Sequence, residues 1–177
     1  MNKSVKVFIF LLLTLALLAA GCGETTAPEK VNSATGETTV ASGSAEVKTP
    51  EVFSVGESVK MGDLQFTVNS VRNSNGNNFI KPKEGNVYLL ADCTIDNLSQ
   101  EATSISSILM FKVVDNEGYN YNVTIGPDTR GTLDGELAPG RKMRGELVFE
   151  VPVQAQSLEL IFEPNLFGFG QAIYKIK

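Results

Sequence analysis

The sequence contains no histidine and no tryptophan, and it has only two cysteines. Without histidine, the chain lacks the side chain that most often serves as a general base or as a metal ligand. An excess of basic residues is also missing, because 15 Lys and Arg stand against 20 Asp and Glu, which gives a net charge of −5. Neutralising phosphates of a nucleic acid requires clustered cations, so this charge argues against a nucleic-acid partner.

The chain also lacks an apolar run long enough to cross a bilayer. Residues 7–20 are apolar except for Thr14, and this run is shorter than the roughly 20 residues that a spanning helix needs. Lys3 and Lys6 precede the run, and small residues close it at positions 19–21. A positive flank, a short apolar segment and small residues, in that order, predict a signal peptide over residues 1–21.

One of the two cysteines directly follows these small residues. The stretch "ALLAAGCGE" resembles the lipobox of bacterial lipoproteins, although Ala19 stands where a leucine is usual. The resemblance implies cleavage before Cys22 and a diacylglyceryl group on its sulfur, which anchors the protein in the cell membrane, facing the extracytoplasmic side. A thioether cannot pair with Cys93, so we expect no disulfide bond. The alternatives are a plain secretory signal with an incidental cysteine, or an uncleaved anchor helix.

Residues 22–50 begin with the cysteine expected to carry the lipid. They are rich in Thr, Ser, Gly, Ala and Glu, contain no aromatic residue, and have valine as their only large aliphatic residue. Such a segment buries too little apolar surface to offset the entropy lost on ordering, so we expect a disordered tether. The alternative is a peripheral strand within "ETTVASGS".

From residue 51 to residue 177 the pattern changes to short apolar alternations separated by turn residues, which predicts an all-β domain. The apolar residues Leu64, Phe66, Val68 and Val71 face one side only if the register slips once, so we expect a β-bulge near residues 69–70. No convincing amphipathic helix is present, and the nearest candidate, "SQEATSISSIL", is rich in serine and β-branched residues.

Two strands carry residues that need an interpretation. In "NVYLLADCTIDN" (86–97), Cys93 alternates in phase with Leu89 and Ile95, which favours a small buried hydrophobe over a reactive thiol. In "LMFKVVDNEGYNYNVT", the residues Asp115 to Gly118 separate two strands, and the glycine supplies the left-handed conformation that a hairpin loop needs. The acidic residues of this loop lack the spacing of a calcium loop.

The stretches "KPKEGNVYLLADCTIDNLS", "LDGELAPGRKMRGELVFEVP" and "LELIFEPNLFG" resemble a family of Gram-positive bacterial lipoproteins that carry a domain of unknown function. The resemblance covers residues 51–177. It implies an immunoglobulin-like antiparallel β-sandwich, similar in fold to the mycobacterial immunoprotective extracellular antigen, and no catalytic residues. The name of a telomeric repeat-binding factor is sometimes attached to this domain, but an acidic, exported chain without a recognition helix does not support it.

The sequence offers little for catalysis or metal binding. No S-x-x-K or G-x-S-x-G frame occurs, and the carboxylate pair Asp134 and Glu136 is better explained as a solvated loop rim. The methionines Met61, Met110 and Met143 are not grouped with one another, so core packing is favoured over a soft-metal site. We therefore expect a protein that is not an enzyme and binds no cofactor or metal.

Binding remains the most natural role for a sandwich on a tether, because loops at its ends carry recognition while the sheets stay rigid. We expect a non-catalytic module that binds an unknown protein at the cell surface. The alternatives are capture of a small ligand or cell-wall polymer, and a structural role in a membrane complex.

The segment "PNLFGFGQ" (164–171) places large apolar residues on a loop between the last two strands. Such residues either fold back to close the end of the core or stand exposed as a binding patch. We expect Phe167 to pack inward and Phe169 to contribute to a partner surface.

The lipid anchor generates a direct prediction. Two acyl chains on Cys22 give stable membrane attachment where a single chain is marginal, so Cys22→Ala should release the protein from the membrane or leave it unprocessed. Cell fractionation followed by mass determination measures both outcomes. A Cys22→Ala protein that fractionates with membranes at its mature size would show that another feature provides the anchor.

Overall fold

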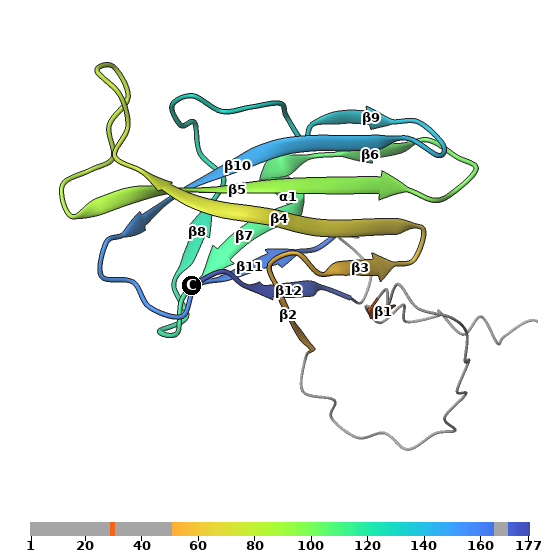
Figure 1. Cartoon of the computed structure of the whole chain (residues 1–177), viewed down its shortest axis with the longest axis horizontal. Helices are drawn as coiled ribbons and strands as arrows, with labels where there is room; N and C mark the ends of the chain where they lie inside the picture. Colours follow the sequence, from red (N-terminus) through yellow and green to blue (C-terminus); the bar gives the residue numbers. More distant parts are fainter. Residues whose placement is uncertain (1–28, 31–50, 165–169) are drawn as a thin grey trace, which may run out of the picture.

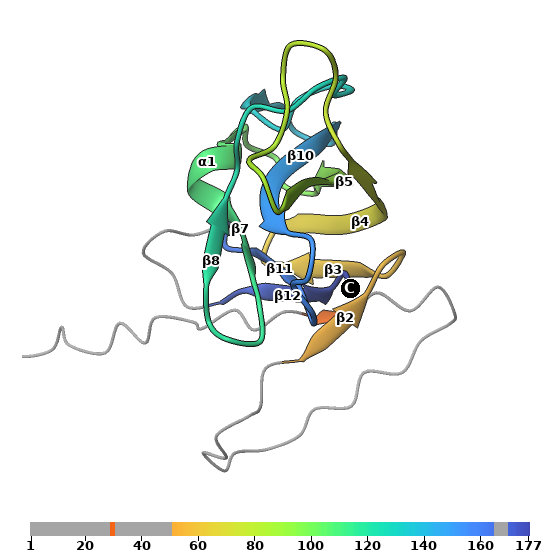
Figure 2. The ribbon, with the colours of Figure 1, turned by 90° about the vertical axis from the view of Figure 1, so that its left-hand side faces the viewer.

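The computed structural model describes residues 29–30, 51–164 and 170–177, and it confirms the all-β fold class (Figure 1). Two five-stranded sheets lie face to face, and the view along the long axis shows them as separate layers (Figure 2). This arrangement is a β-sandwich, in which each sheet buries its apolar face against the other.

The first sheet has the order β1-β3-β4-β5-β10, and all of its neighbouring strands are antiparallel. Its strands are β1 (Glu29–Lys30), β3 (Ser58–Met61), β4 (Leu64–Ser74), β5 (Asn86–Asn97) and β10 (Lys142–Pro152). Strand β1 falls within the segment expected to be a tether, so at these two residues the chain differs from the expectation and pairs with β3. An edge strand leaves backbone groups unpaired, which explains why a polar segment can add to it.

The second sheet has the order β2-β12-β11-β7-β8. Its strands are β2 (Val52–Ser54), β12 (Ala172–Lys175), β11 (Glu159–Phe162), β7 (Phe111–Val114) and β8 (Asn120–Asn122). The pair β2 and β12 is parallel, whereas the sequence predicted an antiparallel sandwich. These strands come from opposite ends of the domain, so no hairpin turn imposes an antiparallel direction on them.

Two smaller elements complete the described chain. Strands β6 (Thr103–Ile105) and β9 (Gly135–Leu137) form a two-stranded ribbon, and helix α1 (Ser107–Met110) is a single turn that precedes β7. The short helix overlaps the end of the serine-rich stretch (99–109) that was the nearest helix candidate in the sequence and extends one residue beyond it. No helix within the described part of the chain is both long enough and apolar enough to span a membrane.

The predicted slip of register in β4 is confirmed. Val68 lies opposite Cys93 and Ser70 lies opposite Asp92, so Asn69 is the extra residue of a β-bulge. Its side-chain amide donates hydrogen bonds to Asp92 Oδ1 at 3.3 Å and to Thr94 Oγ1 at 2.9 Å. The bulge keeps Val71 against the core after the slip.

An aromatic cluster forms the centre of the core. Phe66 of β4 lies 4.5 Å from Phe162 and 5.5 Å from Phe111, between ring centroids, and both partners belong to the opposite sheet. Tyr174 of β12 meets Phe66 edge-on at 5.4 Å. Its buried hydroxyl donates to the backbone carbonyls of Glu57 and Phe66, both at 2.9 Å. Tyr174 therefore joins the sheets by ring packing and by hydrogen bonding.

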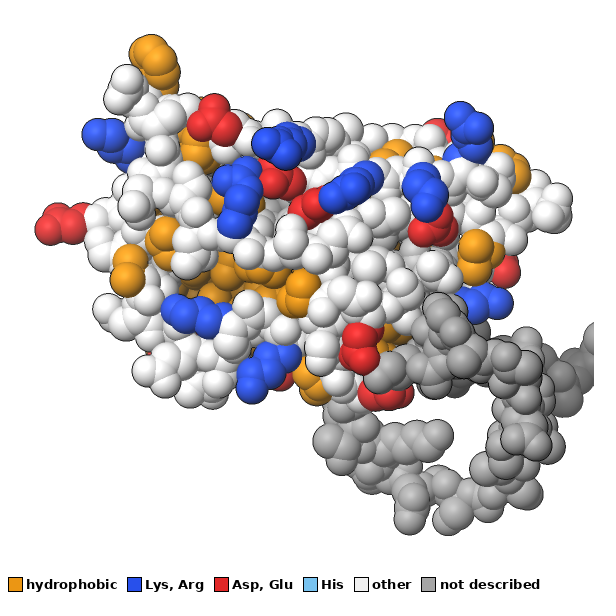
Figure 3. Space-filling view, in the orientation of Figure 1, with side chains coloured by type: hydrophobic (Ala, Val, Ile, Leu, Met, Phe, Trp, Pro, Cys, Tyr) orange, Lys and Arg blue, Asp and Glu red, His pale blue; other side chains and the backbone are white. Residues whose placement is uncertain are grey.

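The outer face of the first sheet is partly covered, which the alternating pattern did not predict. Tyr88, Leu90 and Val148 are buried there in a second, small apolar cluster. Ile80, from the connection between β4 and β5, packs on this cluster, and a Cβ at Gly126 would lie 2.5 Å from Val148. Elsewhere this face is polar, and Figure 3 shows Lys and Arg interleaved with Asp and Glu over it.

Cys93 is fully buried and has no disulfide partner among the described residues, and desolvation raises the pKa of its thiol well above the ordinary value. We predict that it resists thiol reagents in the folded protein and reacts after unfolding. Cys93→Ser should lower the free energy of unfolding by about 1 to 3 kcal/mol, because a hydroxyl replaces a buried thiol. Denaturant titration and timed thiol labelling measure the two effects, and fast labelling of the native protein would contradict the prediction.

Candidate functional site

The two site residues predicted from the sequence cannot be placed. Cys22, the expected lipid attachment site, and Phe169, the expected partner contact, both lie outside the described residues, as does Phe167. They remain predictions from the sequence.

The carboxylate pair Asp134 and Glu136 does not form an acid–base site. Asp134 accepts hydrogen bonds from the Ser107 backbone N–H at 2.7 Å, the Ser107 hydroxyl at 2.9 Å and the Thr132 hydroxyl at 3.0 Å. Burial raises the pKa of Asp134, but these hydrogen bonds outweigh it and hold the pKa below its usual value. Asp134 thus fixes the start of α1, while Glu136 is exposed on β9.

The methionines pack as the sequence predicted. Met61 is buried, and Met110 and Met143 are partly buried against the same core. Within residues 29–30, 51–164 and 170–177, no group of three or more His, Cys, Asp or Glu side chains is arranged to hold a metal ion.

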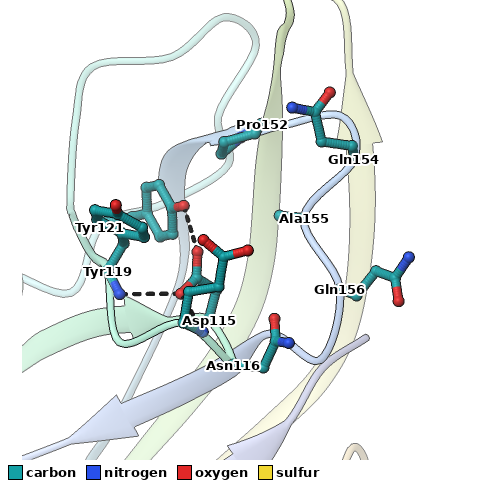
Figure 4. A pocket seen from close by; sticks show the side chains of 9 residues that line it. Asp115, Asn116, Tyr119, Tyr121, Pro152, Gln154, Ala155 and Gln156 are labelled. Carbon is teal, nitrogen blue, oxygen red and sulfur yellow. Dashed lines mark hydrogen bonds between the residues drawn. The ribbon is translucent and has the colours of Figure 1, made fainter.

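A pocket of about 370 Å³ lies at the end of the sandwich where β10 ends and β7 turns into β8 (Figure 4). One wall is the β7–β8 hairpin, and the other is the turn that follows β10. Two tyrosines, three side-chain amides and two carboxylates line it: Tyr119, Tyr121, Asn116, Gln154, Gln156, Asp115 and Glu117. The pocket falls within the size range of small-ligand sites.

The hairpin wall is organised by Asp115. Its Oδ1 accepts hydrogen bonds from the backbone N–H groups of Glu117 and Tyr119, both at 2.9 Å. This is the local side-chain bonding that makes aspartate a turn former. Gly118 has a φ of +88°, so the predicted left-handed glycine of the hairpin is confirmed. The turn therefore holds Tyr119 and Tyr121 in fixed positions at the pocket.

The two tyrosines play different parts. Tyr121 donates its hydroxyl to Asp115 Oδ2 at 2.7 Å, and desolvation together with this carboxylate raises the pKa of Tyr121 to about 12. It therefore stays protonated at neutral pH and serves as a fixed wall. Tyr119 is 63% exposed, and its ring stands beside that of Tyr121 (Figure 4).

The opposite wall is also held in place. The Ala155 N–H donates to the Pro152 carbonyl at 3.0 Å, and Lys177 Nζ donates to the carbonyls of Ala155 at 2.7 Å and Val153 at 3.3 Å. Asn116, Gln154 and Gln156 are exposed, and within the described part of the chain their amides have no hydrogen-bond partner. The pocket thus combines a rigid frame with three free amides.

The sequence predicts a hairpin at the Asp115 loop but does not predict the pocket. The local signal was the Tyr-x-Tyr pattern beside an aspartate turn. The other wall comes from residues more than 30 positions later in the chain, and only the sandwich brings the two segments together.

The fold and the end pocket define this protein as a β-sandwich with a preformed surface site. The chain belongs to the family described as "domain of unknown function (DUF4352)", whose profile matches residues 53–173.

Similar proteins come from Bacillus subtilis. The uncharacterized protein YxkC is 28% identical over 124 residues, which cover 63% of this chain and 69% of YxkC. The crystal structure of the yjhA protein matches with a TM-score of 0.57 and 22% identity, over 71% of this chain and 100% of that one. The crystal structure of ycdA, described as a candidate lipoprotein, matches with a TM-score of 0.54 and 17% identity, over 64% of this chain and 36% of that one. At these identities, the two crystal structures support the fold alone.

The Asp115–Tyr121 contact generates a prediction. In Asp115→Asn, the amide oxygen can still accept the turn hydrogen bonds, but the negative charge that disfavours the phenolate is lost. The phenol pKa of Tyr121 should therefore fall below about 12 but stay above its ordinary value of about 10, because burial still disfavours the phenolate, and the hairpin should be retained. Titration followed by tyrosine absorbance measures this shift.

Tyr119→Phe in the same background is the control, because it removes the neighbouring phenol from the titration. An unchanged Tyr121 titration in Asp115→Asn would show that Asp115 does not influence this phenol.

Proposed function

We propose that the protein is a lipid-anchored, non-catalytic binding module on the extracytoplasmic side of the membrane, and that its end pocket takes an uncharged sugar unit of a surface glycan. The observation that carries the proposal is the pairing of an exposed tyrosine ring, Tyr119, with free side-chain amides in one rigid pocket.

The anchor rests on the order of elements at the N-terminus, where a positive flank, a short apolar run and small residues lead to Cys22. The ycdA protein, which shares the fold, is itself described as a candidate lipoprotein, and the same location is proposed for this chain. A domain held there meets polymers and proteins of the cell surface.

The ligand class follows from the chemistry of the pocket. A sugar ring has an apolar face that packs on an aromatic ring, and its hydroxyls both donate and accept hydrogen bonds. The side-chain amide of Asn116 carries one donor group and one acceptor atom, and so does that of Gln154. Each amide can therefore bind two neighbouring hydroxyls of a sugar. No lysine or arginine of the described residues lines this pocket, whereas Asp115 and Glu117 do. Their negative charge disfavours an anionic ligand.

The same geometry supports a non-catalytic role. The carboxylate of Asp115 already accepts three hydrogen bonds, and the raised pKa of Tyr121 keeps that phenol neutral. A general acid or base needs a pKa near the working pH, and neither group meets that requirement.

A protein partner is the second candidate, and Phe79 favours it. Its ring is 95% exposed on the connection between β4 and β5. This loop is ordered, because Asn77 Oδ1 accepts hydrogen bonds from the N–H groups of Phe79 and Ile80, both at 2.9 Å. An exposed aromatic side chain on an ordered loop is typical of a contact with another protein.

We predict that the full chain in detergent binds β-1,4-linked N-acetylglucosamine oligomers and that Tyr119→Ala weakens this binding by about tenfold or more, through the loss of ring packing. The single variant Gln154→Ala should also weaken this binding. Because the chain lacks tryptophan, tyrosine fluorescence and calorimetry can follow the titration.

Two variants are matched controls. Phe79→Ala removes an exposed ring, and Gln100→Ala removes an exposed amide, both outside the pocket. Equal affinities for Tyr119→Ala and Phe79→Ala would rule out the end pocket as the sugar site, and selective loss of protein partners in Phe79→Ala would favour the second candidate.

A further inference from the structure

Three of the four arginines in this acidic chain meet at one surface hollow. The hollow has a volume of about 500 Å³ and lies on the outer face of the first sheet. Arg72 comes from β4, Arg144 from β10, and Arg130 from the connection between β8 and β9. The fourth arginine, Arg141, does not line it. The hollow shares no lining residue with the end pocket.

The strand register places the first two arginines around two carboxylates. Asp92 of β5 lies opposite Glu146 of β10, and this row runs between the rows that carry Arg72 and Arg144. Arg72 donates from Nε and Nη2 to the two carboxylate oxygens of Glu146, at 3.0 and 2.9 Å. Arg144 makes the same bidentate contact with Asp92, from Nε and Nη2 to the two carboxylate oxygens. Each guanidinium is therefore held in a fixed orientation.

The third arginine is positioned by its backbone. A Cβ at Gly131 would lie 2.4 Å from the Arg144 carbonyl oxygen, and a Cβ at Gly145 would lie 2.7 Å from the backbone of Thr132. Only glycine at both positions lets the connection lie directly on β10. The Arg130 N–H then donates to Glu146 Oε2, and the Arg130 carbonyl accepts from the Glu146 N–H, both at 3.0 Å.

The charges are layered, with the acids beneath and the arginines above. The Glu146 and Asp92 side chains are 9% and 18% exposed, whereas the Arg72 and Arg144 side chains are 46% and 64% exposed. Both Arg72 and Arg144 keep Nη1 unused in the described contacts. Within the described ranges the guanidinium of Arg130 forms no salt bridge and no side-chain hydrogen bond, although its charge helps to lower the pKa of Asp92 and Glu146. A ligand that approaches this face therefore first contacts guanidinium N–H groups that have no hydrogen-bond partner among the described residues.

We infer that this arginine hollow binds phosphodiester groups of an anionic surface polymer. Planar guanidinium groups match the oxygens of a phosphate, and fixed ones lose little entropy on binding. The two carboxylates beneath balance part of the positive charge, and the chain as a whole carries −5. Binding should therefore be moderate for a single phosphate, strengthened by a repeating polymer and sensitive to salt.

The decisive variant is Arg130→Gln, because among the described residues it removes no salt bridge and keeps the backbone hydrogen bonds of residue 130. Arg141→Gln is its matched control, since it makes the same change in net charge outside the hollow. The probe is a poly(glycerol phosphate) chain, titrated against the full chain in detergent at about 50 and 200 mM salt. Inorganic phosphate and phosphatidylglycerol vesicles form two further arms.

The expected result is salt-dependent binding of the polymer that weakens by about fivefold or more in Arg130→Gln and changes less than about twofold in Arg141→Gln. Both variants should melt at the temperature of the unmodified protein. Arg144→Lys keeps the charge but loses the bidentate donor geometry of the guanidinium, so it should also weaken binding of the polymer.

Equal effects of Arg130→Gln and Arg141→Gln would overturn the site, because they would reduce it to general electrostatic attraction. Arg130-dependent binding to vesicles that exceeds binding to the polymer would overturn the polymer as the source of the phosphodiester. Tyr119→Ala should leave polymer binding unchanged, so failure of the sugar pocket and failure of this site give different results.

Discussion

The packing of Phe66 against aromatic rings of the opposite sheet is the contact on which the remaining structure depends. Phe66 touches Phe111, Phe162 and Tyr174, and the Tyr174 hydroxyl bonds to backbone carbonyls near β3 and on β4. Aromatic pairs contribute more than their buried area alone, and a buried hydroxyl needs partners. Together these contacts fix the spacing and orientation of the two sheets, and hence the positions of every loop that connects them.

A rigid pair of sheets explains why this protein can carry preformed sites on short loops. The end pocket has one wall on the second sheet, at the β7–β8 hairpin, and the other on the turn that leaves β10 of the first sheet. Asp115 fixes one wall and Lys177 fixes the other. The core and these hydrogen bonds hold the two walls in place, and a pocket held in this way avoids part of the entropic cost of binding.

The outer face of the first sheet uses a different device. Loops cover Leu90 and Val148 with apolar contacts, and a pair of glycines lets one of these loops reach β10. Beside this covered area, at the arginine hollow, the carboxylates of Glu146 and Asp92 lie beneath the guanidinium groups of Arg72 and Arg144. An acidic domain thereby presents a local group of cationic donors.

The sequence by itself determined the features that depend on local pattern: the strands, the bulge at Asn69, the hairpin at Gly118 and the burial of Cys93. Alternation with a period of two and turn residues encode these within a few positions. The lipid anchor at Cys22 is likewise a local motif and stays a prediction, as does the partner contact at Phe169.

Only the tertiary structure decided the rest. Gln154 and Tyr119 line one pocket, and Arg130 lines one hollow with Arg72 and Arg144, because strand register and sheet packing join distant segments. Single-strand periodicity carries no information about which strands become neighbours. For the same reason, the alternating pattern of β5 did not reveal that loops bury Leu90 on the outer face, and the parallel alignment of β2 with β12 followed from the closing of the sandwich.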